Sequence, residues 1–180
     1  ELQHLKQLLF PAVKIELPER GNGQTYEKRI ERLKILDHHQ ESIARNFDGG
    51  HRIVSGPSGS GKTLVLVHKA AFLKQYNSAI KNILFVCFNI TLVNYIKRLL
   101  ADKLVPMGED GVTVCHFYEL CGDIIGEEIV FEKEDTEYYE MVLQEASSKI
   151  GVYLMRYDAL LVDEGQDFDE EMLKILLNLL

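Results

Sequence analysis

The stretch Gly56-Pro-Ser-Gly-Ser-Gly-Lys62-Thr63 decides the fold of this 180-residue chain. It satisfies the pattern G-x-x-x-x-G-K-[ST] at every fixed position. The apolar segment His51-Arg-Ile-Val-Ser55 directly before it predicts a strand, and a helix is predicted directly after it, from Lys62 to Tyr76. A strand, a glycine-rich loop and a helix in this order predict a phosphate-binding loop. The alternative is a glycine-rich turn that merely resembles the pattern.

The residue types of this loop suit a bound polyphosphate. Its glycines allow turns that direct successive backbone N–H groups at phosphate oxygens, and the helix N-terminus adds the positive end of its dipole. Lys62 would neutralise the β- and γ-phosphates, and Thr63 would offer its hydroxyl to Mg²⁺. The residues predicted to bind ATP in this loop are Gly56, Ser58, Gly59, Ser60, Gly61, Lys62 and Thr63.

Beyond the loop, an alternation of strand and helix continues along the chain. Strands are predicted at 82–88, 111–115 and 158–162, each followed by a helical pattern, the first of which runs over 90–103. These strands are short and continuously apolar, which is typical of a parallel sheet covered on both faces. We therefore predict an α/β, three-layer fold with a mostly parallel sheet.

The composition indicates one soluble globular domain, because 46% of the residues are apolar and 27% are charged. The sequence has no run of 18 apolar residues, and its first residues lack the layout of a secretory signal, so a cytoplasmic location is expected. The three cysteines, Cys87, Cys115 and Cys121, have no paired Cys-x-x-Cys spacing. We expect them to be reduced structural thiols.

Charge is distributed unevenly along the sequence. Residues 1–105 carry a net charge of +7 and residues 106–180 carry −15, which gives −8 for the whole chain. Such an asymmetry either marks an anion-binding face beside an acidic one or is ordinary surface charge.

Two acids, Asp163 and Glu164, follow the last predicted strand, at the edge where an open parallel sheet presents its ligands. Asp163 is placed to hold Mg²⁺ through water, and Glu164 to take a proton from the water that attacks the γ-phosphate. By itself the pattern fits a solvated strand end equally well. Together with the phosphate loop it predicts ATP hydrolysis.

The segment Val162-Asp-Glu-Gly-Gln-Asp-Phe168 resembles the Asp-Glu-x-Gln-Asp signature of superfamily 1 DNA helicases of the UvrD/Rep type. Leu36-Asp-His-His-Gln40 resembles the adenine-reading glutamine motif of that family. The resemblance covers residues 36–168 and implies a RecA-like motor lobe. It also implies that Gln40 reads adenine and that Gln166 senses the nucleotide and communicates with the DNA-binding surface, supported by Asp167.

Two further blocks, 83–92 and 112–118, resemble those that lie near single-stranded DNA in such helicases. The resemblance implies that Phe88 presents a stacking face and that Asn89 and Thr91 bond phosphates or bases. It makes His116 a further candidate for a nucleic-acid contact. The alternatives are a core role for Phe88 and a structural role for His116.

We therefore predict a helical and irregular lead-in over 1–35 and a partial, truncated RecA-like lobe over 36–180, with a small acidic helical insertion at about 122–156. The expected function is the ATP-binding N-terminal portion of an ATP-dependent DNA helicase, a piece of a longer polypeptide that also holds the second motor lobe. ATP and Mg²⁺ are the expected cofactors, and single-stranded DNA or RNA is the expected partner.

Without the second lobe this piece is expected to hydrolyse ATP poorly, because its transition-state arginines would be missing. Two other functions fit parts of the sequence. One is a stand-alone P-loop ATPase that acts on no nucleic acid. The other is a non-catalytic nucleotide-binding module with the acidic stretch 127–145 as its interaction face.

Overall fold

The computed structural model describes residues 12–14, 38–46, 50–131 and 136–180, the first of these ranges by its backbone only. The chain divides into two units, residues 1–72 and 73–180, and the boundary falls inside one helix, α3 (Lys62–Tyr76). Except for residues 12–14, the lead-in predicted over 1–35 lies outside the described residues.

The first unit contains a helical segment at 38–45 and two short parallel strands, β1 (Ala12–Lys14) and β2 (Ile53–Ser55). The loop 56–61 follows β2 and leads into α3, in the predicted order. Ala44 and Val65 are fully buried in this unit. The prediction of an irregular lead-in was wrong for residues 12–14, because a three-residue strand is too short to show a side-chain alternation.

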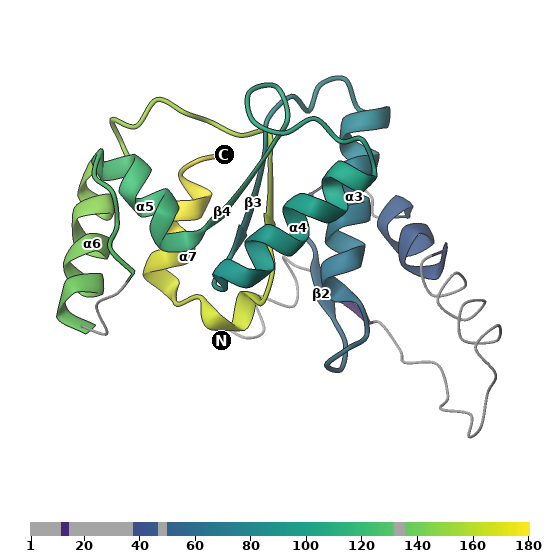
Figure 1. Cartoon of the computed structure of the whole chain (residues 1–180), viewed down its shortest axis with the longest axis horizontal. Coiled ribbons are helices and arrows are strands. Elements are labelled where there is room, and N and C mark those ends of the chain that lie inside the picture. The colour runs from purple at the N-terminus through teal and green to yellow at the C-terminus, as the bar shows by residue number, and fades with distance from the viewer. Residues whose placement is uncertain (1–11, 15–37, 47–49, 132–135) are drawn as a thin grey trace. The chain divides into compact units, whose positions relative to one another are not determined.

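The second unit is built on a three-stranded parallel sheet with the strand order β4-β3-β5 (Figure 1). The strands and helices alternate along the chain, as the sequence predicted. They are β3 (Ile83–Cys87), α4 (Ile90–Asp102), β4 (Val112–His116), α5 (Phe117–Ile125), α6 (Thr136–Lys149), β5 (Ala159–Val162), the 3-10 helix η1 (Gly165–Asp167) and α7 (Glu170–Leu177).

Helices cover both faces of this sheet. All five residues of β3 are buried, and Leu84 and Val86 belong to one apolar cluster with buried residues of α5, α6 and α7. Helix α4 packs against β3 and β4, but its buried residues are not part of that cluster, so it lies on the other face (Figure 1). The three layers confirm the predicted α/β fold class.

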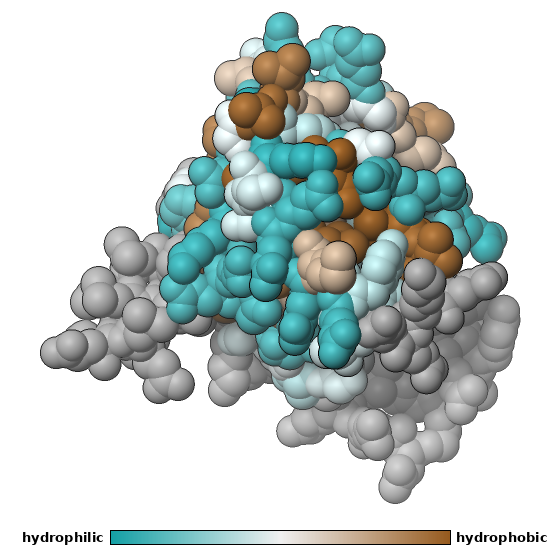
Figure 2. All heavy atoms as spheres, turned by 90° about the vertical axis from the view of Figure 1, so that its left-hand side faces the viewer, coloured by the Kyte–Doolittle hydropathy of each residue, from teal (hydrophilic) through white to brown (hydrophobic). Residues whose placement is uncertain are grey.

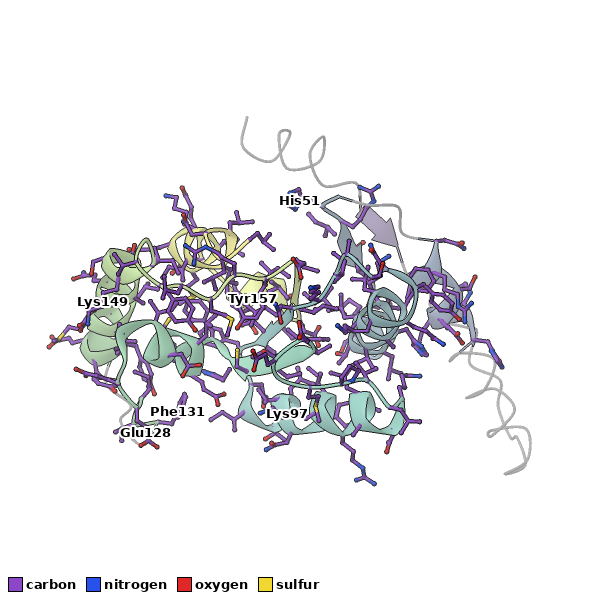
Figure 3. All side chains as sticks on the ribbon, turned by 90° about the horizontal axis from the view of Figure 1, so that it is seen from above. His51, Lys97, Glu128, Phe131, Lys149 and Tyr157 are labelled. Carbon is purple, nitrogen blue, oxygen red and sulfur yellow. The ribbon has the colours of Figure 1, made fainter. Side chains whose placement is uncertain are left out.

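Hydrogen bonds align β5 on β3 at the amino ends of the strands. The Asp158 carboxylate accepts from the backbone N–H groups of Lys81 (2.7 Å) and Asn82 (2.8 Å), and these bonds hold its pKa below the ordinary value. The Asp158 N–H in turn donates to the Asn82 carbonyl at 2.8 Å. The neighbouring residue, Tyr157, is buried, and its N–H donates to the Leu179 carbonyl (Figure 3).

In the acidic region, helix α5 is capped by Gly126, which has a φ of +81°, and residues 127–131 form no helix. The next described helix, α6, begins at Thr136. The side of the molecule where α6 lies is largely hydrophilic, with scattered apolar residues (Figure 2). On α6 itself, Lys149 forms an ion pair with Glu145 at 2.7 Å. Within the described residues, no helix has the length and apolar character needed to cross a bilayer.

Candidate nucleotide site

The loop after β2 has the backbone conformation that its glycines permit. Gly59 and Gly61 have φ values of +76° and +84°, in the left-handed region where other residues are strained. The Ser60 N–H donates to the Pro57 carbonyl at 3.2 Å and closes the turn. A Cβ added to Gly59 would meet nothing within 4 Å, so Gly59 is required by its φ and not by a close neighbour.

Lys62 stands at the first residue of α3, where the helix N-terminus attracts anions. Its ammonium group donates to the carbonyls of Gly56 (3.2 Å) and Pro57 (3.3 Å), so it lies over the loop itself. Phosphate oxygens are stronger acceptors than neutral carbonyls, because they are charged. The geometry of Lys62 therefore suits an exchange of these carbonyls for a bound phosphate.

Gln40, on the helical segment 38–45, contacts this loop directly. It is only 3% exposed, and its Nε2 donates to the Ser60 carbonyl at 3.0 Å. A Cβ on Gly61 would lie 1.8 Å from that nitrogen, so an alanine at this position would displace the Gln40 amide and would also be strained at a φ of +84°. Within the described residues, Gln40 Oε1 and Ser60 Oγ are buried without a hydrogen-bond partner. The amide of Gln40, which the resemblance implies reads adenine, is thus bound to the loop through its donor end.

The predicted carboxylates lie in the second unit, at the carboxyl end of β5. Asp163 is 2% exposed, and its backbone N–H donates to the Val86 carbonyl, which continues the pairing of β5 with β3. Its Oδ1 accepts from the Glu164 N–H at 3.0 Å. Glu164 has a φ of +50°, and Gln166 Nε2 donates to its Oε2 at 2.7 Å. Such a left-handed non-glycine residue is strained, and such strain gathers at functional sites.

An aromatic cluster anchors this carboxylate segment. Phe168 is 7% exposed, and its ring meets Phe88 at 5.4 Å and Phe117 at 5.5 Å between centroids, both edge to face. Phe168 carries no predicted role, although it is an apolar residue between acids directly after the Asp-Glu-x-Gln-Asp signature. That contrast is the signal that would have indicated an anchor.

Phe88, Asn89 and Thr91, the first candidates for nucleic-acid contacts, lie where β3 passes into α4. Phe88 is half-buried in the aromatic cluster, with a stacked partner in Phe117. The Asn89 Oδ1 accepts from the N–H groups of Thr91 (2.9 Å) and Leu92 (3.3 Å), so it caps α4. Thr91 is exposed in the first turn.

His116, the remaining candidate, ends β4 and caps α5. Its Nδ1 accepts from the Tyr118 N–H at 3.2 Å, so in the neutral ring Nε2 carries the proton and donates to the Phe88 carbonyl at 3.0 Å. Burial lowers the pKa of His116, which favours the neutral ring. His116 is 7% exposed, and both of its ring nitrogens have hydrogen-bond partners. These contacts fit the structural role given above as the alternative. The nucleic-acid contacts of these four residues stay predictions.

The three cysteines are free and buried, and burial raises the pKa of each, for Cys121 to about 12. A raised pKa keeps a thiol protonated and unreactive. Within the described ranges, no group of three or more His, Cys, Asp or Glu side chains is arranged to hold a metal ion. Mg²⁺ at nucleotide sites takes only one or two protein oxygens and completes its coordination with phosphate and water. Thr63 and Asp163 are oxygen donors of this kind.

Comparison with known protein families gives a match over most of the chain. A family model described as AAA domain matches residues 39–180, and this domain occurs in UvrD/Rep-like helicases and related P-loop ATPases. No curated protein and no solved structure matches the chain. The matched range begins next to Gln40 and contains both the phosphate loop and the carboxylate segment. The chain therefore belongs to the AAA domain family, as a P-loop nucleotide-binding module.

Proposed function

We propose that the chain is the ATP-binding part of the first motor lobe of an ATP-dependent DNA helicase. The observation that carries the proposal is the carboxylate segment: a buried Asp163 and a left-handed Glu164 held by Gln166, at the carboxyl end of a central-sheet strand. Ligands of open α/β sheets bind at this edge. A module that only bound nucleotide would not need a carboxylate held in this way.

Within this proposal, the loop binds the phosphates. Lys62 exchanges the carbonyls of Gly56 and Pro57 for phosphate oxygens, and the first turn of α3 adds its N–H groups. Gln40, whose Nε2 donates to the Ser60 carbonyl, would read adenine through its amide once the side chain turns its buried Oε1 toward the base. Adenine recognition and the shape of the phosphate loop would thus share one side chain.

Hydrolysis needs a base and a divalent cation. Glu164 would take the proton from the attacking water while the γ-phosphoryl group is transferred to that water. Thr63 and Asp163 would hold Mg²⁺, which when bound neutralises charge on the phosphate oxygens. Single-stranded nucleic acid is the proposed partner, at the carboxyl ends of β3 and β4.

The first test is binding of a fluorescent ATP analogue with Mg²⁺ to the parent chain, Lys62→Ala and Lys69→Ala. Lys69→Ala is the matched control, because it removes the same charge from the same helix. The Lys69 side chain lies over the Phe72 ring rather than in the loop. We expect Lys62→Ala alone to lose binding. Equal binding by all three proteins would refute the nucleotide site.

The second test is single-turnover hydrolysis, with and without single-stranded DNA. Without a transition-state arginine we expect a rate on the order of 10⁻⁴ per second, as in a related nucleotide hydrolase, and loss of that rate in Glu164→Gln. DNA binding should weaken steeply with salt, because phosphate contacts release counterions. Hydrolysis without any DNA binding would refute the helicase assignment and favour a stand-alone ATPase.

A further inference from the structure

The pair Gln166 and Glu164 forms a side-chain hydrogen bond inside the carboxylate segment. Gln166 Nε2 donates to Glu164 Oε2 at 2.7 Å, the short distance typical of a bond to a charged acceptor. The two residues are separated by Gly165 alone, in the 3-10 helix η1. The bond lies wholly within the second unit of the chain.

The backbone that carries both side chains is fixed at its two ends. On one side, the Glu164 N–H donates to Asp163 Oδ1, and Asp163 itself is bonded to β3 through the Val86 carbonyl. On the other, the Asp167 N–H donates to the Glu164 carbonyl at 2.9 Å, and the buried ring of Phe168 follows. With the backbone held in this way, the remaining freedom of Glu164 lies in its side-chain torsions.

Those torsions decide whether Glu164 can act as a base. A glutamate has three of them, and a catalytic carboxylate must be held close to its productive geometry. The amide of Gln166 fixes one carboxylate oxygen, so the direction of the other oxygen is also fixed. Gln166 is itself exposed, so its contact with Glu164 is not a consequence of packing in the core.

We propose that Gln166 is a positioning residue for Glu164: its side-chain amide orients the carboxylate that accepts a proton from the attacking water. The inference rests on the proposed function, because it assigns Glu164 the role of the base. In this role Gln166 acts through Glu164 alone, in contrast to the direct sensing of the nucleotide that the resemblance implies. It would therefore change the rate of hydrolysis without changing nucleotide affinity.

The test compares the parent chain with Gln166→Met, which keeps the length of the side chain but has no donor, under single-turnover conditions. We expect the rate to fall on the order of tenfold, the scale seen when a hydrogen-bond partner that orients a functional side chain is removed. Nucleotide Kd should be unchanged. Gln144→Met is the matched control, because Gln144 is an exposed glutamine on α6.

A double-mutant cycle isolates the route of the effect. In Glu164→Gln, where the base is gone, adding Gln166→Met should lower the residual rate no further. The side-chain amide resonance of Gln166, assigned in NMR spectra by its loss in Gln166→Met, should shift in Glu164→Gln because the acceptor has lost its charge. This readout needs no nucleotide and no turnover.

The outcomes separate the two claims. A parent chain that neither binds nor hydrolyses ATP refutes the proposed function and, with it, this role of Gln166. A parent chain that hydrolyses ATP at the same rate as Gln166→Met, or more slowly, refutes the inference alone. An amide resonance that does not move in Glu164→Gln, or a further loss of rate in the double variant, also overturns it.

Discussion

Gly122 should resist replacement by alanine, although it lies inside helix α5. A Cβ at this position would lie 2.6 Å from the Glu127 carbonyl oxygen and 2.9 Å from Ile129 Cγ1. The Glu127 oxygen is a backbone atom, and the N–H of Glu127 donates to the Gly122 carbonyl at 3.0 Å. The turn that ends α5 would therefore have to move to admit a methyl group.

Two opposing terms set the size of the effect. Alanine in a helix interior is favoured over glycine by about 1 kcal/mol. Overpacking in a buried site costs about 1–3 kcal/mol, and a weakened Glu127 hydrogen bond costs about 0.5–1.5 kcal/mol more. We therefore expect Gly122→Ala to lower the free energy of unfolding by about 2 kcal/mol.

The measurement is urea unfolding followed by circular dichroism, with amide hydrogen exchange over 117–129 as a local readout of α5 and its turn. Gly151→Ala is the control, because nothing lies within 4 Å of its added Cβ and its φ is not in the left-handed region. Its stability should stay within about 0.5 kcal/mol of the parent, as for a surface change. If Gly122→Ala proved as stable as the parent, or more stable, the gain in helix propensity would outweigh the cost of overpacking, and the packing argument would be wrong.

Three further predictions concern other described residues. Gly61→Ala should lose nucleotide binding, because its Cβ would lie 1.8 Å from Gln40 Nε2 and its φ of +84° is strained for alanine; binding equal to that of the parent in a binding assay would contradict this. The lowered pKa of Asp158 means that its contribution to stability is complete above about pH 3.8 and is lost as the pH falls through the folded-state value. The urea midpoints of the parent and Asp158→Asn should therefore converge in acid. A difference that stays constant with pH would contradict a stabilising role of the ionised Asp158. Because burial lowers the pKa of His116, the unfolded chain binds more protons below about pH 6.5, and stability should fall from there downward. His116→Asn, whose side-chain oxygen can replace Nδ1 as the capping acceptor, should flatten that slope between pH 7.5 and 5.

The fold was predictable where local signals and packing agree. The predicted helix from Lys62 to Tyr76 has the bounds of α3, because the loop pattern fixes its start and the apolar spacing carries it onward. The strands β3, β4 and β5 were each predicted to within two residues at either end, since a fully buried parallel strand is a continuous apolar run. The three-residue β1 carries no such signal.

The candidate site was predictable in its residue types but not in its contacts. The spacing of Gly56, Lys62 and Thr63 is a local property of the sequence. The bond from Gln40 to Ser60 joins residues 20 positions apart, and it depends on how a helix packs under the loop. The left-handed conformation of Glu164 likewise belongs to the folded turn before η1, and a sequence does not reveal such strain.

The strand order of the second unit has a consequence for synthesis of the chain. Strand β3 is central and wholly apolar, yet its partner β5 comes much later in the chain. Asn82 and Asp158, the residues directly before β3 and β5, are 76 positions apart. At about 5–20 residues per second, the ribosome would take roughly 4–15 s to supply that partner. During this interval one edge of β3 is an unpaired hydrophobic strand, the kind of edge that recruits other chains. A ribosome-bound chain that stops before β5 should therefore be the form most in need of a chaperone.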